Sequence, residues 1–161
     1  MVHPPRVADL DAQRAAMRRL SFLVGKWNGE ARLRRGPDEW VVLQQTEEAQ
    51  YKLDGLLLVI AGVGRRESDG QLVLQALGIL SFEEESGTYR LRAFNDGRFL
   101  ETEVKLLDEG RAISWGFVLG QIATKSILRI NERGEWTELA EYAVGSEPPT
   151  KLWELVVRRT M

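Results

Sequence analysis

The fold is decided by a short run near the N-terminus, Phe22-Leu23-Val24-Gly25-Lys26-Trp27-Asn28-Gly29-Glu30. This Gly-x-Trp-x-Gly-Glu run lies where a helical pattern gives way to the alternating pattern of a strand. A tryptophan at that place suits a bulky side chain that plugs one end of a β-barrel. The run therefore indicates a barrel fold, and it does not identify a ligand or an activity.

Turn signals divide the rest of the chain into segments of strand length. Asp-Gly pairs such as Asp54-Gly55 and Asp96-Gly97 suit type I′ hairpins, because glycine adopts a positive φ without a Cβ clash. The expected strands are 26-35, 40-53, 56-66, 71-82, 88-95, 98-107, 111-119, 121-130, 135-144 and 151-159. Short links between about ten strands predict an all-β fold, an up-and-down antiparallel β-barrel whose closure removes the exposed sheet edges.

A short amphipathic helix is expected ahead of the barrel, over about 9-20. Its apolar residues recur at helical spacing, and Asp9 or Asp11 is placed to cap its start. The apolar stripe is suited to a partner, but we favour a helix that covers the barrel of about 25-160. Because 161 residues are about the length of one domain, we expect a single β-barrel domain over 1-161.

Composition excludes several classes of function. The formal net charge is only -2, so no broad electrostatic field favours nucleic acid or an anionic membrane. The chain has no cysteine, which removes disulfides and thiolate metal sites, and its start does not resemble a signal peptide. The longest apolar run, Leu56 to Val63, is far shorter than the roughly 20 residues of a membrane-spanning helix. We expect a cytoplasmic protein.

Period-two alternation predicts which side chains point into the barrel. Either face of 135-144 carries a glutamate, Glu138 or Glu141, and 56-66 and 71-82 are apolar on both faces, so neither can be assigned. Gly62, Gly64 and Gly78 mark bends in the barrel or the close approach of a ligand, and we favour bends. The inward sets are Val41, Leu43, Gln45, Glu47, Ala49 and Tyr51; Leu100, Thr102, Val104 and Leu106; Ile122, Thr124, Ser126 and Leu128; and Trp153, Leu155 and Val157.

The Gly25-x-Trp27 element, the strands that follow it and the Arg158-Arg159 ending resemble the calycin superfamily of lipocalins and fatty-acid-binding proteins. Within that superfamily the run looks most like the nitrobindin group and bacterial lipocalin-like domains of unknown function. The resemblance implies that Trp27 packs at the closed end beneath Arg159 or Arg158, a cation–π contact of about 0.5–2 kcal/mol. Nitrobindins bind haem through a histidine near the C-terminal strand, whereas the only histidine here is His3. We therefore expect neither haem nor another cofactor.

Polar side chains that alternation places inside the barrel are the candidates for ligand contact. An unpaired carboxylate in an apolar cavity is costly, so a buried glutamate is expected to be hydrated, to have a raised pKa, or to pair with Arg90 or Arg92. With one histidine and no cysteine, we predict no catalytic residue and no metal site. The predicted ligand-contacting residues are Trp27, Glu47, Tyr51, Arg92, Trp115, Thr124, Glu138 and Tyr142.

Three functions stay open. The first is binding of a small apolar or amphipathic molecule inside the barrel, and the second is a cofactor-independent enzyme that uses a buried glutamate with tyrosine or arginine. Both need an internal cavity of about 300 Å³ or more. The third is a packed barrel that serves as an oligomerisation or interaction module. A homodimer through Leu56 to Val63 and Leu72 to Leu80 fits the apolar outer faces expected there.

Overall fold

The structure, a computed structural model, describes residues 7–160. His3 and Met161 lie outside the described residues. The elements are α1 (Leu10–Arg18), η1 (Ser21–Leu23), β1 (Gly25–Gly36), β2 (Glu39–Lys52), β3 (Leu57–Arg66), β4 (Leu72–Glu83), β5 (Thr88–Asn95), β6 (Arg98–Leu107), η2 (Asp108–Gly110), β7 (Ala112–Leu119), β8 (Ile122–Ile130), β9 (Trp136–Val144) and β10 (Thr150–Thr160). Among these residues no helix has the length and apolar character needed to cross a membrane.

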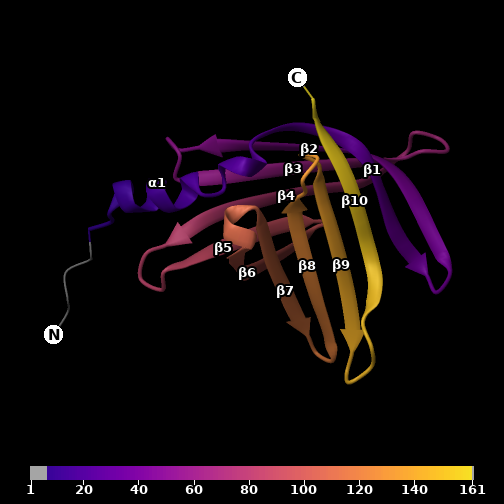
Figure 1. Ribbon diagram of the computed structural model, residues 1–161. Helices are drawn as coiled ribbons and strands as arrows, with labels where there is room; N and C mark the ends of the chain where they lie inside the picture. Colours follow the sequence, from indigo (N-terminus) through magenta and orange to yellow (C-terminus); the bar gives the residue numbers. More distant parts are fainter. Residues whose placement is uncertain (1–6, 161) are drawn as a thin grey trace.

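All ten strands form one closed antiparallel barrel in which each strand pairs with its neighbours in sequence (Figure 1). Closure is made by β1 and β10, whose register runs from Lys26 opposite Thr160 to Leu33 opposite Trp153. Asp96 and Gly97 both have positive φ, as a type I′ hairpin requires. The predicted all-β, up-and-down barrel is therefore confirmed.

The alternation of side chains also follows the predicted pattern. On β2 the buried residues are Leu43, Gln45, Glu47 and Ala49, so Glu47 lies inside the barrel. On β9, Trp136 and Ala140 are buried on the same face as Glu138, which resolves the choice between Glu138 and Glu141. The inward faces that the sequence left unassigned carry Leu58, Ile60, Gly62 and Gly64 on β3 and Leu74, Ala76, Gly78 and Leu80 on β4.

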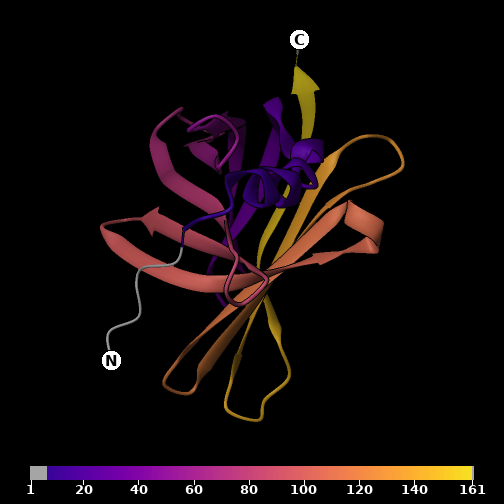
Figure 2. The ribbon, with the colours of Figure 1, turned by 90° about the vertical axis from the view of Figure 1, so that its left-hand side faces the viewer.

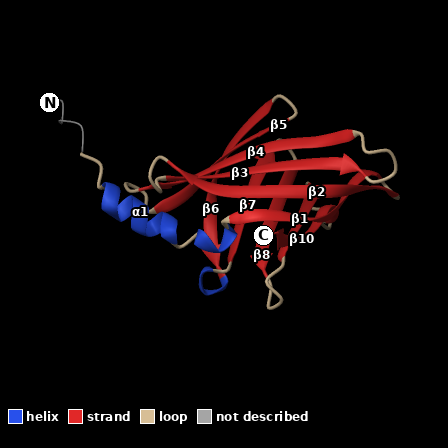
Figure 3. Cartoon of the chain, turned by 90° about the horizontal axis from the view of Figure 1, so that it is seen from above, coloured by secondary structure: helices blue, strands red, loops and turns tan. Residues whose placement is uncertain are grey.

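The helix closes one end of the barrel (Figures 2 and 3). Its N-terminus is capped by the Asp9 side chain, which accepts a hydrogen bond from the Ala12 backbone N–H. Met17 near its end and Leu20 and Leu23 beyond it are fully buried in the core. The hydroxyls of Tyr51 and Tyr89 donate to the carbonyls of Met17 and Ala16, at 2.7 and 2.8 Å. The helix predicted over about 9-20 thus covers the barrel, as expected.

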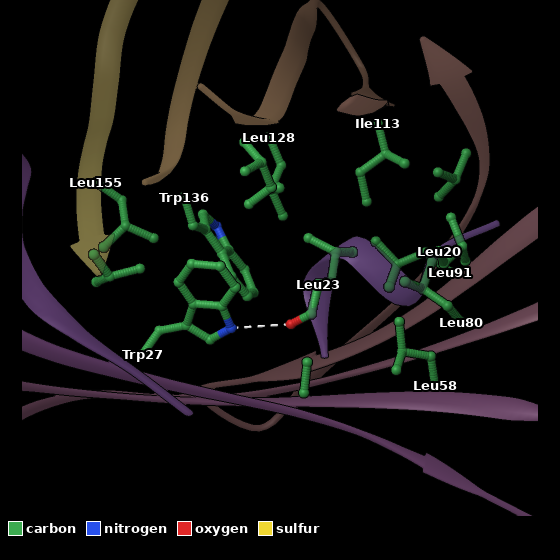
Figure 4. Packing of buried hydrophobic residues seen from close by; sticks show 14 of the residues in the cluster. Leu20, Leu23, Trp27, Leu58, Leu80, Leu91, Ile113, Leu128, Trp136 and Leu155 are labelled. Atoms are coloured by element: carbon green, nitrogen blue, oxygen red, sulfur yellow. Dashed lines mark hydrogen bonds between the residues drawn. The ribbon is translucent and has the colours of Figure 1, made fainter. Parts of the chain in front are cut away.

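Trp27 forms the floor at this end (Figure 4). Its indole Nε1 donates to the Leu23 carbonyl at 2.9 Å, and its ring meets the ring of Trp136 edge-on, with centroids 5.4 Å apart. The Arg159 guanidinium lies 4.4 Å from the Trp27 ring centroid and donates to the carbonyls of Phe22 and Val24. The expected contact between Trp27 and a C-terminal arginine is therefore present, and Arg159 makes it.

Candidate functional site

A cavity of about 340 Å³ occupies the barrel interior beyond the closed end. Its volume satisfies the predicted lower limit for a ligand pocket, and every strand contributes to its wall. The lining residues are Leu33, Glu47, Ile60, Gly62, Leu74, Ala76, Leu77, Gly78, Leu80, Leu91, Ala93, Phe94, Asn95, Leu100, Ile113, Trp115, Phe117, Ser126, Leu128, Trp136, Glu138, Ala140, Leu152 and Trp153. The wall is mostly apolar, and Glu47 and Glu138 carry its only ionisable side chains.

Glu47 lies on β2 between Trp27 of β1 and Gly62 of β3, its cross-strand partners. Only 9% of its surface is exposed, and its Oε1 accepts a hydrogen bond from Gln45 Nε2 at 2.9 Å. Loss of water around the carboxylate, followed by the nearby charge of Glu138, raises the pKa of Glu47 to about 8. The Gln45 hydrogen bond opposes this rise without cancelling it.

Glu138 reaches the cavity from β9. Burial raises its pKa to about 7, against the opposing effect of a hydrogen bond that Trp136 Nε1 donates to its Oε2 at 3.3 Å. Part of the Glu138 surface is accessible, because the side chain borders the cavity, although the carboxyl lies deep inside the barrel. Its raised pKa follows from this depth, since an apolar enclosure replaces little of the lost hydration.

Neither glutamate has a cationic partner among the described residues. The prediction that Arg90 or Arg92 pairs with a buried glutamate is wrong, because both arginines alternate with the cavity-lining Leu91 and Ala93 and so face outward. Both guanidinium groups instead lie within 3.5 Å of the Glu101 carboxylate on the outer surface. A raised pKa is one of the two outcomes expected for a buried carboxyl without an arginine, the other being hydration.

Two glycines on β3 make room for the polar side chains of β2. A Cβ on Gly62 would lie 2.7 Å from Glu47 Oε2, and one on Gly64 would lie 2.4 Å from Gln45 Oε1. Gln45 Oε1 is itself buried and accepts no hydrogen bond from the described residues. The favoured interpretation of these glycines as bends misses this role, which is to leave space for the carboxyl and amide groups beside the cavity.

Of the predicted ligand-contacting residues, the structure brings Glu47, Trp115 and Glu138 together around the cavity. The other five lie apart from its wall. Trp27 and Tyr51 belong to the closed end, and Arg92 faces outward. Thr124 Oγ1 accepts from the Phe117 backbone N–H, and Tyr142 borders a separate surface depression with Pro37 and Thr150. Whether any of the eight contacts a ligand stays a prediction.

Several polar or aromatic residues near the cavity were not among the predicted ligand contacts. Ser126, Trp136 and Trp153 line the wall, and Gln45 holds Glu47. All four lie on faces that alternation had correctly assigned to the interior or had left as one of two options. The alternation of inward and outward side chains is enough to identify these residues as interior candidates. It does not show where along the barrel axis each one lies.

The cavity wall does not suit haem, the group that nitrobindins bind. The lining residues include no histidine, methionine or tyrosine to coordinate haem iron. His3 lies outside the described residues. No group of three or more His, Cys, Asp or Glu side chains suited to a metal ion occurs in residues 7–160. The described wall of the cavity therefore offers haem iron no histidine, methionine or tyrosine ligand.

Comparison with known proteins identifies a similar fold. No protein-family model and no curated protein matches this chain. Among solved structures, the crystal structure of Rv2717c from M. tuberculosis matches with a TM-score of 0.67 and 15% sequence identity, over 91% of this chain and 98% of that chain. At this identity the match establishes a shared fold, which in this chain is a closed ten-stranded barrel.

Proposed function

We propose that this protein binds a small apolar or amphipathic molecule inside the barrel, with any polar end of the molecule at Glu47 and Glu138. The observation that carries the proposal is the cavity of about 340 Å³, which has an apolar wall and two buried carboxyls without cationic partners. An apolar enclosure with a few polar groups is the usual construction of a small-molecule site. A fully packed barrel would leave no such space.

The calycin resemblance supports the same function. Calycins are barrels that hold small molecules, and the floor contact between Trp27 and Arg159 agrees with what that resemblance implies. We propose a calycin relationship for this chain on those grounds. Within it, we propose a nitrobindin-like relationship on the Gly25-x-Trp27 run and the barrel, and we expect no haem.

Octanol is a suitable neutral probe, because it joins an alkyl chain to a single hydroxyl. We expect calorimetric titration to detect octanol binding to the purified protein, and we expect Ala93→Phe to abolish it by filling the cavity beside Gly78. Ala123→Phe is the matched control, since Ala123 is exposed and lies outside the cavity wall. Native mass spectrometry of the purified protein would identify a molecule that it retains. Absence of any bound molecule together with no octanol binding would contradict the proposal.

A cofactor-independent enzyme is the second candidate, favoured by one observation. The pKa values of about 8 and about 7 at Glu47 and Glu138 lie near neutrality, where a carboxyl serves well as a general acid or base. Glu47→Gln and Glu138→Gln, made separately, distinguish the candidates once a retained molecule is known. Turnover of that molecule by the wild type, lost in a variant that still binds it, would favour the enzyme.

A further inference from the structure

We infer that the cavity selects a small amphipathic amine, whose ammonium group lies against Glu47 and Glu138 and whose hydrocarbon part lies along the apolar wall. This inference rests on the proposed function and adds the chemical class of the ligand. It starts from an imbalance of charge inside the barrel. Two carboxyls enter the same enclosure from β2 and β9, and no lysine, arginine or histidine of residues 7–160 lines the cavity with them.

Three arginines of the barrel strands are directed away from this pair. Arg90 and Arg92 of β5 lie on the outer surface with Glu101, and Arg159 of β10 lies over Trp27 at the closed end. The lining residues of the remaining strands carry no charge at all. A single cation brought by a ligand would therefore meet two carboxyls and no competing positive charge.

Hydrogen bonding points to the same class of ligand. Two donors beside the pair are already engaged, because Gln45 Nε2 donates to Glu47 Oε1 and Trp136 Nε1 donates to Glu138 Oε2. Glu47 Oε2 has no partner among the described residues, and Gln45 Oε1 is a buried acceptor without a donor. The site thus has a surplus of acceptors, and a primary ammonium group supplies three donors and no acceptor.

The wall disfavours a metal ion as the cation. Calcium takes six to eight oxygen ligands and magnesium keeps several waters, whereas the surroundings here are Leu, Ile, Ala and aromatic side chains. The Gly62 position, which any side chain would crowd, keeps the Glu47 carboxylate within the cavity.

The test compares octylamine, octanol and octanoate, which share one alkyl chain and differ in the head group. At pH 8 we expect octylamine to bind at least about tenfold more tightly than octanol, and octanoate to bind most weakly, because two carboxyls attract an ammonium group and repel a carboxylate. Titration in two buffers of different ionisation enthalpy should show proton release with octylamine and none with octanol. The double variant Glu47→Gln/Glu138→Gln should lose the preference and the proton release, whereas Ala123→Phe, outside the cavity wall, should keep both.

The outcomes separate the inference from the proposed function. Equal binding of octylamine and octanol would overturn the inference and leave the proposed function standing, as would a preference for octanoate. Failure of all three probes to bind, with nothing retained by the purified protein, would overturn both. An octylamine preference that survives in the double variant would also overturn the inference, because the preference would then arise elsewhere in the barrel.

Discussion

At the closed end of the barrel the polar groups around Trp27 and the helix have hydrogen-bond partners within the protein, whereas the cavity carboxyls have no cationic partner among residues 7–160. The Trp27 indole, the Arg159 guanidinium and the hydroxyls of Tyr51 and Tyr89 all donate to backbone carbonyls of the α1–β1 region. Glu47 and Glu138 each accept one hydrogen bond from a neighbouring side chain and lie near a second negative charge.

This difference separates two kinds of burial. Buried groups that are fully hydrogen-bonded contribute to stability, while buried carboxyls with raised pKa values lower the stability of the state in which they are ionised. The closed end therefore holds the barrel together. Ionisation of the two carboxyls in the cavity lowers the free energy of unfolding. A bound molecule whose head group pairs with them would offset this loss.

The largest loss of stability is expected from a substitution at the closed end. Trp27→Ala should lower the free energy of unfolding by about 3–5 kcal/mol, because it leaves a void in the core and removes the contacts to Trp136, Arg159 and Leu23. Denaturation by urea would measure this loss. Trp40→Ala is the control, since Trp40 is only partly buried and stacks with Arg32 and Arg34, so a loss of about 1 kcal/mol or less is expected. Equal losses in the two variants would contradict the assignment of Trp27 as the floor.

The next effect is the pH dependence produced by the cavity. Because burial raises the pKa values of Glu47 and Glu138 from 4.5 to about 8 and about 7, the folded protein holds more protons than the unfolded chain between about pH 5 and 8. Stability is therefore highest near the acid end of this window and falls as pH rises. The free energy of unfolding measured by urea denaturation should fall across the window, since one pKa unit corresponds to about 1.4 kcal/mol.

The double variant Glu47→Gln/Glu138→Gln should flatten this pH dependence. Glu135→Gln should retain it, because hydrogen bonding from Asn131 lowers the pKa of Glu135 and places its titration below the window. His3 is present in all three proteins, so its own titration does not affect their comparison. An unchanged slope in the double variant would show that the two carboxyls are not buried as described.

Most of the barrel could be predicted from the sequence, because its turns and the faces of its strands depend on residues that are close together in the chain. Turn residues such as Asp96-Gly97 need a backbone with positive φ, and residues two apart along a strand share a face. This was enough to place Glu47 inside. The same reasoning placed Trp153, Leu155 and Val157 on one face, and all three lie inside.

The site was less predictable because partners and depth depend on the closed barrel. On β5 apolar residues occupy both faces, so alternation could not show that Leu91 and Ala93 face inward while Arg92 faces outward. Alternation assigned Tyr51 to the inner face correctly, yet this tyrosine lies at the end of β2 and reaches the helix. The position of a residue along the barrel axis follows from strand stagger, which a single sequence does not display.

The smallest effect concerns the hydrogen bonds that fasten the helix to the barrel. Tyr51→Phe and Tyr89→Phe should each lower the free energy of unfolding by about 0.5–1.5 kcal/mol and speed amide exchange in α1, because each removes one hydroxyl donor to a helix carbonyl. Tyr142→Phe is the matched control, since Tyr142 lies at a surface depression that no residue of α1 lines. This change should leave the free energy of unfolding and the amide exchange in α1 nearly unchanged. Octanol affinity should stay the same in all three variants, because none of these tyrosines lines the cavity. A marked loss of octanol binding in Tyr51→Phe or Tyr89→Phe would mean that the helix also shapes the cavity, and the division between a closed end and a binding end would then have to be abandoned.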